Sequence, residues 1–267
     1  LAHDAFYAAT DYYAPGPVHL NVAFREPLSS AIDVRPVEML IQSDRRIEPG
    51  ITLELTRGPN TIVIAGADAG PRAEEVAHEG GWPLIAEVTS GSRFGRNLVP
   101  AYRELLANPE LTSQIERIVV FGHPTLSREV PALIGDSSTG IQTIVVRGAA
   151  PEGYNPGLNV SSFVNDVKVE TGESDRDWLG LWIVSGREAF ERYESTAIDA
   201  ALATAPNVTA SRSESIDEKK AFLAAELAAS RVKISRELLV DAVWRSTWPH
   251  DRLVFAASRL SRVADKF

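Results

Sequence analysis

Short runs of apolar, mostly β-branched residues alternate with helix-like stretches through the middle of the chain. Each run is bounded by glycine, proline or polar residues, as buried strands usually are. The runs are residues 61–65 (TIVIA), 83–88 (PLIAEV), 117–121 (RIVVF) and 142–146 (QTIVV), with residues 164–169 as a further candidate. Because strands that alternate with helices pair in parallel, the pattern predicts an α/β fold with a doubly wound, Rossmann-like parallel sheet.

Apolar residues at helical spacing predict helices in several further segments. Residues 178–193 are rich in aromatics, and we predict that they form the helix that closes the sheet domain, with these side chains in its core. The large apolar residues of this run are Trp178, Leu181, Trp182, Phe190 and Tyr193. Helices are also predicted at residues 1–13, 221–229 and 236–244.

Two short strands are predicted near the ends of the chain. Residues 18–24 alternate apolar and other side chains, and residues 253–257 precede a helix that begins at Ser258. A strand without neighbours exposes unpaired backbone groups. We therefore expect both ends to be parts of larger units, and we expect the polar, Pro- and Gly-containing residues 29–60 to link domains.

Composition narrows the class of protein. The 267 residues carry 27 basic and 36 acidic side chains, a formal net charge of -9, and no dense basic tract, so nucleic acid is not an expected partner. No apolar run reaches the roughly 20 residues of a membrane span. The absence of cysteine excludes disulfides and thiolate catalysis and is compatible with a cytoplasmic location. The five histidines are scattered and form no metal-binding pair.

Turns that follow the predicted strands are the candidate ligand sites. The glycine turn at residues 66–70 leads into a helix, as phosphate-binding turns do, but lacks the GxGxxG spacing and a P-loop lysine. Arg128 lies near a predicted helix start after a strand, where open α/β sheets bind ligands, and arginine can grip a carboxylate with two hydrogen bonds. Arg93 and Arg96 follow the neighbouring strand, and all three could equally be solvated surface arginines.

Ser258 and Arg262 are four residues apart at the last strand-to-helix junction. If the helix begins at Ser258, this spacing places the hydroxyl and the guanidinium on one face and predicts an anion clamp beside unpaired backbone N–H groups. Ser258 could instead be a plain N-cap.

Four stretches in the same order resemble the MenD family, the thiamine-diphosphate-dependent 2-succinyl-5-enolpyruvyl-6-hydroxy-3-cyclohexene-1-carboxylate synthases of menaquinone biosynthesis. They are GPVHLNVAFREPL from Gly16, GWPLIAEVTSGSRFG from Gly81, VVFGHPTLSREV from Val119 and LVFAASRLSR from Leu253. The resemblance implies residues 1–30 at the end of a pyrimidine-binding domain, a linker at 31–52, a middle domain at 53–193, and a linker with the start of a diphosphate-binding domain at 194–267. It also implies that this chain is a middle piece, inactive by itself.

The resemblance further implies the reaction, in which 2-oxoglutarate is decarboxylated and the resulting carbanion adds to isochorismate. Thiamine diphosphate and Mg²⁺ serve the complete enzyme, which is expected to be a homo-oligomer, and this chain is expected to hold neither cofactor. Arg128, Ser258 and Arg262 match residues that contact substrate in the family. Ser127 and Arg259 depart from the basic residue and the asparagine that many relatives carry there.

Two other interpretations remain open on the sequence alone. Another thiamine-diphosphate enzyme, such as a decarboxylase or an acetolactate synthase relative, would have a similar middle domain, since a fold does not fix a function. A free-standing Rossmann-like module that binds a nucleotide or a small acid, and regulates another protein, would also fit the strand pattern.

Overall fold

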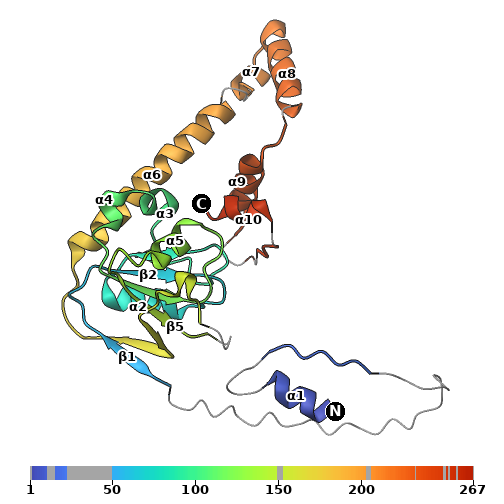
Figure 1. The fold of residues 1–267 in the computed structure, drawn as a ribbon. Coiled ribbons are helices and arrows are strands. Elements are labelled where there is room, and N and C mark those ends of the chain that lie inside the picture. The colour runs from blue at the N-terminus through green and yellow to red at the C-terminus, as the bar shows by residue number, and fades with distance from the viewer. Residues whose placement is uncertain are drawn as a thin grey trace, which may run out of the picture.

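The computed structural model describes residues 2–10, 16–22, 50–148, 153–202, 206–231, 233–248, 251, 253–256 and 258–266. Its centre is a five-stranded parallel sheet, which confirms the predicted α/β class (Figure 1). The strands lie in the order β3 (Leu84–Ala86), β2 (Thr61–Ala65), β4 (Arg117–Phe121), β5 (Gln142–Val146) and β6 (Ser162–Val164). The four main apolar runs of the sequence each supply one strand, although the second is shorter than predicted.

Alternate residues of each strand face opposite layers, as the period of a β-strand requires. Ile62 and Ile64 of β2 pack in the cluster that includes α3 (Tyr102–Leu106), α4 (Pro109–Thr112), α5 (Glu129–Gly135) and α6 (Arg176–Leu202). Val63 and Ala65 pack in the other cluster, with α2 (Arg72–Gly80) and the two-stranded sheet of β1 (Thr52–Leu55) and β7 (Asp166–Val169). The main sheet is therefore covered on both faces, which explains why its strands are continuous apolar runs.

The strand order reverses direction between β2 and β4, because the chain first adds β3 on one side of β2 and then β4 on the other. Ligands of open α/β sheets bind at such a switch point, beside the carboxyl ends of the strands. Here the loops after β2 and β4 touch: Ala67 and His123 exchange backbone hydrogen bonds of 3.2 and 2.8 Å. A side chain at Gly122 (φ 66°) would overlap the carbonyl oxygen of Ala67. The backbone itself thus fills the crevice at the switch point.

The strand predicted at residues 164–169 is two strands that separate at Asn165. β6 pairs with β5 in the main sheet, whereas β7 pairs with β1. The Asn165 side chain accepts a hydrogen bond from the backbone N–H of Ile51 (3.0 Å), and the backbone N–H of Asn165 donates to the Ile51 carbonyl (2.8 Å). β1 thus lies inside the stretch predicted as a linker, most of which is outside the described residues.

Helix α6 confirms the predicted helix and extends beyond it to Leu202. Of its aromatic residues, Trp178 and Trp182 belong to the core, whereas Phe190 and Tyr193 are half-buried. Trp182 is fully buried, and its ring packs edge-on against Trp178 with 5.7 Å between the ring centroids. The Trp178 indole N–H donates to the Thr61 carbonyl (2.8 Å) and so ties α6 to β2. Leu181 lies on the outer side of the helix and is 37% exposed, so not every apolar residue of the run is in the core.

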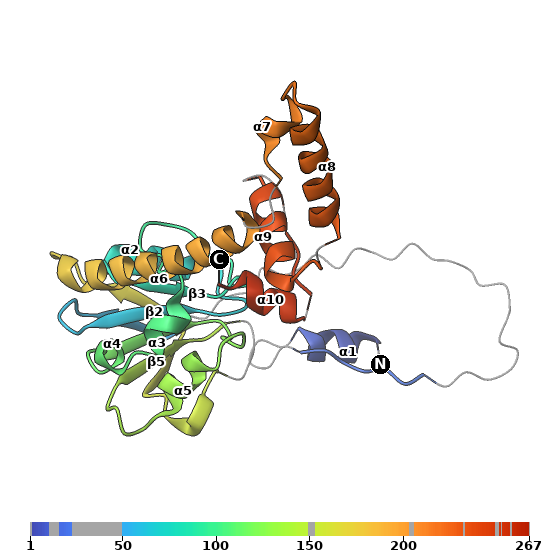
Figure 2. The same cartoon turned by 90° about the horizontal axis from the view of Figure 1, so that it is seen from above.

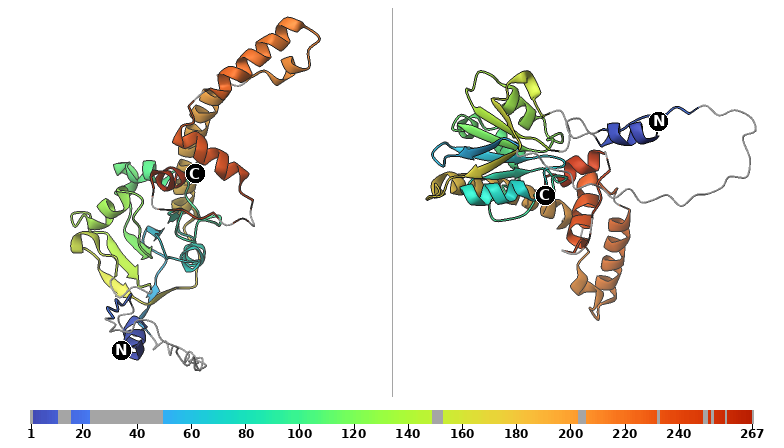
Figure 3. Two further views of the ribbon diagram at one scale, coloured as in Figure 1. Left: turned by 90° about the vertical axis from the view of Figure 1, so that its right-hand side faces the viewer. Right: turned by 90° about the horizontal axis from the view of Figure 1, so that it is seen from below.

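The far end of α6 carries a helical hairpin, α7 (Val208–Ser211) and α8 (Ile216–Ser230), which projects from the α/β domain (Figures 1 and 2). The chain then returns through α9 (Arg236–Ser246) to α10 (Arg259–Ala264), which lies at one end of the domain (Figure 3). A short 3₁₀ helix, η1 (Pro156–Leu158), precedes β6, and α1 (Ala2–Ala9) lies apart from the sheet. In the described segments no helix is long and apolar enough to cross a membrane.

The two strands predicted near the ends are not formed where the structure describes them. Residues 16–22 and 253–256 have no ladder hydrogen bonds, since the described part of the chain offers them no neighbouring strand. Phe24 and Ala257, the last residues of the two predicted strands, lie outside the described residues.

Candidate functional site at the carboxyl edge of the sheet

Several charged side chains gather where β3 and β4 end, at the carboxyl edge of the main sheet. Glu87 directly follows β3, the loop of residues 122–128 follows β4, and α10 packs beside them through Asp265. Tyr102 and Arg103 of α3 complete the group through their bonds to Asp265. This edge is the usual ligand position of a doubly wound sheet.

Glu87 is fully buried and holds the loop after β4. One carboxylate oxygen accepts from the backbone N–H of Leu126 (2.7 Å) and the other from that of Thr125 (3.1 Å). Burial raises the pKa of the Glu87 carboxyl, the nearby Asp265 charge adds to that increase, and the two backbone N–H groups oppose it. A carboxylate buried in this way fixes the backbone just before Arg128.

Asp265, the C-cap of α10, is the most fully satisfied acceptor at this edge. Its side chain is buried, and one oxygen accepts from the backbone N–H of Val88 (2.8 Å). The other oxygen accepts from the Tyr102 hydroxyl (2.6 Å) and from the Arg103 guanidinium (2.7 Å). The pKa of the Tyr102 hydroxyl is raised by burial and by the adjacent carboxylate. Because three donors converge on one carboxylate, Asp265 links α10 both to the segment that follows β3 and to α3.

Arg103 connects the two parts of the edge. Its Nη2 atom donates both to the Asp265 carboxylate and to the carbonyl oxygen of Leu126 (2.9 Å). Burial opposes the charged form, but Tyr102 and Asp265 outweigh it, and the net effect raises the pKa of the guanidinium. A single nitrogen therefore joins the loop that leads to Arg128 and the helix that contains Arg262.

Arg93 and Arg96 are both committed to structural contacts. Arg93 donates to the carbonyl oxygens of Ala86 and Asp265, and burial lowers the pKa of its guanidinium. Arg96 is exposed, and its guanidinium lies 3.1 Å from a ring nitrogen of His78. The alternative of an ordinary structural role fits these two arginines better than a ligand role.

Arg128 lies at the start of α5, as predicted, and its side chain is exposed. The buried Ser127 precedes this N-cap residue, and its hydroxyl accepts a hydrogen bond from the backbone N–H of Val130 (3.3 Å). Among the described residues the Arg128 guanidinium has no hydrogen-bond or ion-pair partner. It is an uncommitted cation at the carboxyl end of β4.

Ser258 acts as the N-cap of α10 and is not part of the helix. Its backbone is extended (φ -150°, ψ 170°), and its hydroxyl accepts from the backbone N–H of Leu260 (3.1 Å). The helix therefore begins one residue later than the predicted clamp requires. Arg262 is exposed, and no described residue makes an ion pair with it. The structure brings the segments of Arg128 and Arg262 together through Arg103, while Ser258 lies at the opposite end of α10 from Asp265.

The described residues do not fit thiamine diphosphate with its metal. They contain no group of three His, Asp or Glu side chains that could hold a metal ion. In the glycine turn after β2, the backbone N–H groups of Gly66, Ala67, Ala69 and Gly70 already donate to protein carbonyls. A phosphate needs such groups free, so the nucleotide interpretation of this turn also loses its support.

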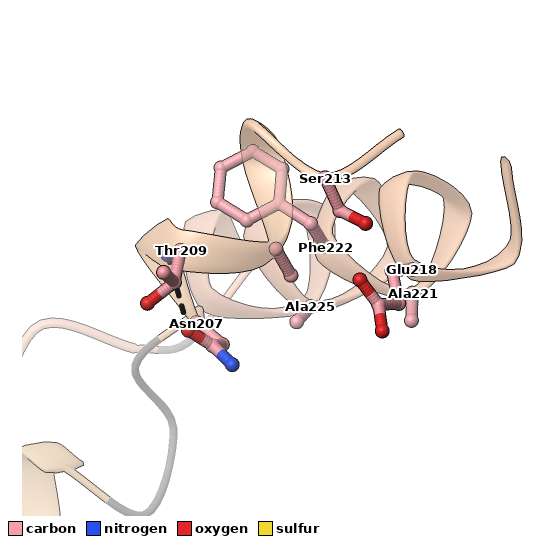
Figure 4. A pocket seen from close by; sticks show the side chains of 8 residues that line it. Asn207, Thr209, Ser213, Glu218, Ala221, Phe222 and Ala225 are labelled. Atoms are coloured by element: carbon pink, nitrogen blue, oxygen red, sulfur yellow. Dashed lines mark hydrogen bonds between the residues drawn. The ribbon is translucent and has the colours of Figure 1, made fainter. Parts of the chain in front are cut away.

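One hollow in the described part of the chain lies on the α7–α8 hairpin, and another lies beside Asp265 and Arg103. A groove of about 720 Å³ runs between α7 and α8, and its lining contains one ionisable side chain, Glu218 (Figure 4). A smaller cavity of about 80 Å³ lies beside Asp265 and Arg103 and is closed by Tyr193 of α6 and Lys266. The groove is on the projecting hairpin and takes no part in the carboxyl edge (Figure 1).

Sequence reasoning missed four residues of this edge: Glu87, Tyr102, Arg103 and Asp265. A signal existed for Glu87, because a charged residue at the end of the apolar run PLIAEV stands where a buried strand is predicted. The sequence carries no comparable signal for Asp265, whose three partners are 162, 163 and 177 residues away along the chain.

The strand order defines an α/β domain with a parallel sheet, a class of fold in which ligands bind at the carboxyl edge. No protein-family model matches the sequence, but individual proteins do. A 2-succinyl-5-enolpyruvyl-6-hydroxy-3-cyclohexene-1-carboxylate synthase of Leifsonia xyli subsp. xyli is 48% identical over 266 residues, covering 94% of this chain and 43% of the relative. The synthase of Clavibacter michiganensis subsp. michiganensis is 42% identical over 282 residues, with 100% and 46% covered.

A third synthase, of a Nocardioides species, is 39% identical over 201 residues and covers 73% of this chain and 36% of the relative. The chain is therefore a relative of the MenD synthases. It spans less than half the length of these curated relatives.

Proposed function

We propose that the chain is part of a menaquinone-biosynthesis synthase that uses thiamine diphosphate, decarboxylates 2-oxoglutarate and adds the succinyl semialdehyde carbanion to isochorismate. One observation carries the proposal: identity of 42 to 48% with named synthases extends over 94 to 100% of this chain. Because the chain spans less than half of those relatives, the proposed activity is that of a complete synthase. None of the three relatives described above is named as another thiamine-diphosphate enzyme or as a free-standing module.

In this proposal the chain binds and orients substrate, and other parts of the synthase hold thiamine diphosphate and Mg²⁺. The proposed substrates carry carboxylates, and arginine is the side chain that binds a carboxylate with two parallel hydrogen bonds. Arg128 and Arg262 are supported as substrate ligands because both are exposed and lack an ion-pair partner among the described residues. Ser258 can still donate its hydroxyl proton while it caps α10.

The remaining parts of the proposal concern the complete synthase. Residues 53–193 form its middle domain, residues 1–30 and 194–267 belong to two flanking domains, and the assembly is a cytoplasmic homo-oligomer. The long return of the chain from α6 through α8 to α10 supports a boundary near the end of the sheet domain (Figure 1).

The test is the kinetic effect of Arg128→Ala and Arg262→Ala in the complete synthase. Loss of a charge-assisted pair should lower kcat/KM about ten- to a hundredfold for the substrate whose carboxylate is held. Arg187→Ala is the matched control, because Arg187 is an exposed arginine on α6 outside the candidate edge. If both edge variants retain the kinetics of the control, the proposed substrate role is wrong. If the complete protein forms no product from 2-oxoglutarate and isochorismate, the proposed function is wrong.

A further inference from the structure

The candidate substrate arginines lie on two segments that are distant in sequence and share one anchor. Leu126, two residues before Arg128, offers its carbonyl oxygen to Nη2 of Arg103 at 2.9 Å. Asp265, three residues after Arg262, offers a carboxylate oxygen to the same nitrogen at 2.7 Å. Arg103 is therefore one direct link that holds the two segments at a fixed relative position.

Further contacts at each segment fix it to the end of β3. Glu87 accepts the backbone N–H groups of Thr125 and Leu126, and Asp265 accepts the backbone N–H of the neighbouring Val88. The consecutive residues Glu87 and Val88, which directly follow β3, thus hold the two segments, and Arg103 adds a link from α3. Its planar guanidinium has donors in a fixed geometry, whereas a lysine ammonium is a mobile point charge.

We propose that Arg103 is a positioning residue, which sets the separation between Arg128 and Arg262 so that the two can bind one substrate together. This inference rests on the proposed function, in which Arg128 and Arg262 contact substrate carboxylates. It assigns Arg103 no contact with substrate, since its Nη2 is committed to Leu126 and Asp265 and the Asp265 side chain is fully buried. The ligand class follows from the chemistry: a small molecule with two anionic groups, one for each arginine.

The first experiment measures the anchoring itself, without any activity. Hydrogen exchange is followed in the 267-residue chain for residues 122–128 and 258–266, in the parent and in Arg103→Lys. Exchange should accelerate about tenfold or more in both segments, because one anchor loosens both. Arg57→Lys is the control: Arg57 also joins separate segments, through the carbonyl oxygens of Glu79, Gly80 and Glu170, but lies outside the carboxyl edge. Faster exchange in only one of the two segments would overturn the proposal. So would an equal acceleration of both segments by Arg57→Lys.

The second experiment measures the functional consequence in the complete synthase. Arg103→Lys should raise the KM of the substrate about five- to twentyfold and change kcat less than about twofold. In the Arg103→Lys background, Arg128→Ala should then reduce kcat/KM by a much smaller factor than in the parent, because Arg128 is already misplaced. If Arg103→Lys does not fold, Asp265→Asn is used in its place, because it weakens the same ion pair from the Asp265 side.

The outcomes separate this inference from the function on which it rests. If Arg128→Ala lowers kcat/KM by the same factor in the parent and in the Arg103→Lys background, the two substitutions act independently. Arg103 then has only a structural role, and the positioning proposal is wrong. If Arg128→Ala and Arg262→Ala have no effect in the parent, the proposed substrate contacts are wrong, and the positioning proposal with them.

Discussion

Arg103 and Asp265 form an ion pair of 2.7 Å that joins α3 to the C-cap of α10 across 162 residues of sequence. The Asp265 side chain is fully buried, while that of Arg103 retains 21% of its exposure. Such a pair stabilises a structure only when additional hydrogen bonds satisfy the remaining polar atoms. Val88 and Tyr102 provide these bonds to Asp265, and Leu126 provides one to Arg103, whose buried Nε has no partner among the described residues. The pair therefore makes α10 part of the sheet domain's edge.

Asp265→Asn should detach α10 from the sheet domain. The amide keeps the shape but loses the charge, and its NH₂ group would face donors where the carboxylate accepts. We expect the free energy of local opening of α10 to fall by about 1 to 3 kcal/mol, which is measured as faster hydrogen exchange at residues 259–265. Asp241→Asn is the control, because Asp241 pairs with Arg245 on the surface of α9 and should change stability by less than about 1 kcal/mol. Equal exchange in both variants would contradict the role of Asp265.

Glu87 should make the stability of the domain fall as the pH rises. Burial raises the pKa of its carboxyl in the folded state above the ordinary value of 4.5. Between that value and the higher folded pKa, the folded state binds more protons than the unfolded state, so the free energy of unfolding decreases with increasing pH. For one group the slope cannot exceed about 1.4 kcal/mol per pH unit. The charged and titratable groups beside it are Asp265 and Tyr154.

The measurement is urea unfolding of the chain at several pH values from about 4.5 upward, compared between the parent and Glu87→Gln. The Glu87→Gln variant cannot ionise at this position. Its free energy of unfolding should therefore decrease less with rising pH than that of the parent. Glu54→Gln removes an exposed glutamate of β1 and should leave the parent's slope unchanged. A parent and a Glu87→Gln variant with parallel pH profiles would show that Glu87 does not titrate differently in the two states.

The strands of the main sheet were predictable because burial on both faces leaves a direct trace in the sequence. β2, β4 and β5 are largely apolar runs, which is the pattern expected of strands that are covered on both faces. The separation at Asn165 was not predictable by the same means. Two consecutive polar residues, Asn165 and Asp166, interrupt the alternation of the run 164–169. That interruption does not identify a partner strand, because the break depends on the long-range pairing of Asn165 with Ile51.

The candidate site was predictable only in part, for a related reason. The position of Arg128 follows from local order, because the loop after a parallel strand always lies at the carboxyl edge. The roles of the anchoring residues depend on contacts between α3, α10 and the segment after β3. The periodicity of apolar residues does not predict such contacts. The start of α10 was misplaced by one residue because serine favours both the N-cap and the first turn of a helix. The structure assigns it to the N-cap.

Gly122→Ala should destabilise the sheet domain more than Gly140→Ala. Both glycines have positive φ, 66° and 69°, where an added Cβ costs about 1 to 2 kcal/mol. A Cβ at Gly140 meets no atom within 4 Å, whereas one at Gly122 would overlap the backbone of Ala67 and Ala69. We expect a loss of more than about 3 kcal/mol for Gly122→Ala in urea unfolding. Equal losses for the two variants would mean that the loops after β2 and β4 are not in contact.

The 267-residue chain should not bind thiamine diphosphate with Mg²⁺. Diphosphate binding needs a metal held by oxygen ligands, or free backbone N–H groups at a turn. The described residues hold no metal cluster, and the turn after β2 uses four of its N–H groups internally. Calorimetric titration should give no heat of binding, and the melting temperature should not move. A dissociation constant of about 10 μM would stabilise the chain by about 2.7 kcal/mol at a hundredfold excess over that constant, a shift that is easily seen. The complete synthase, titrated in parallel, is the positive control. A shift of that size in the 267-residue chain would place a cofactor site within it and would contradict the assignment of this chain to substrate binding alone.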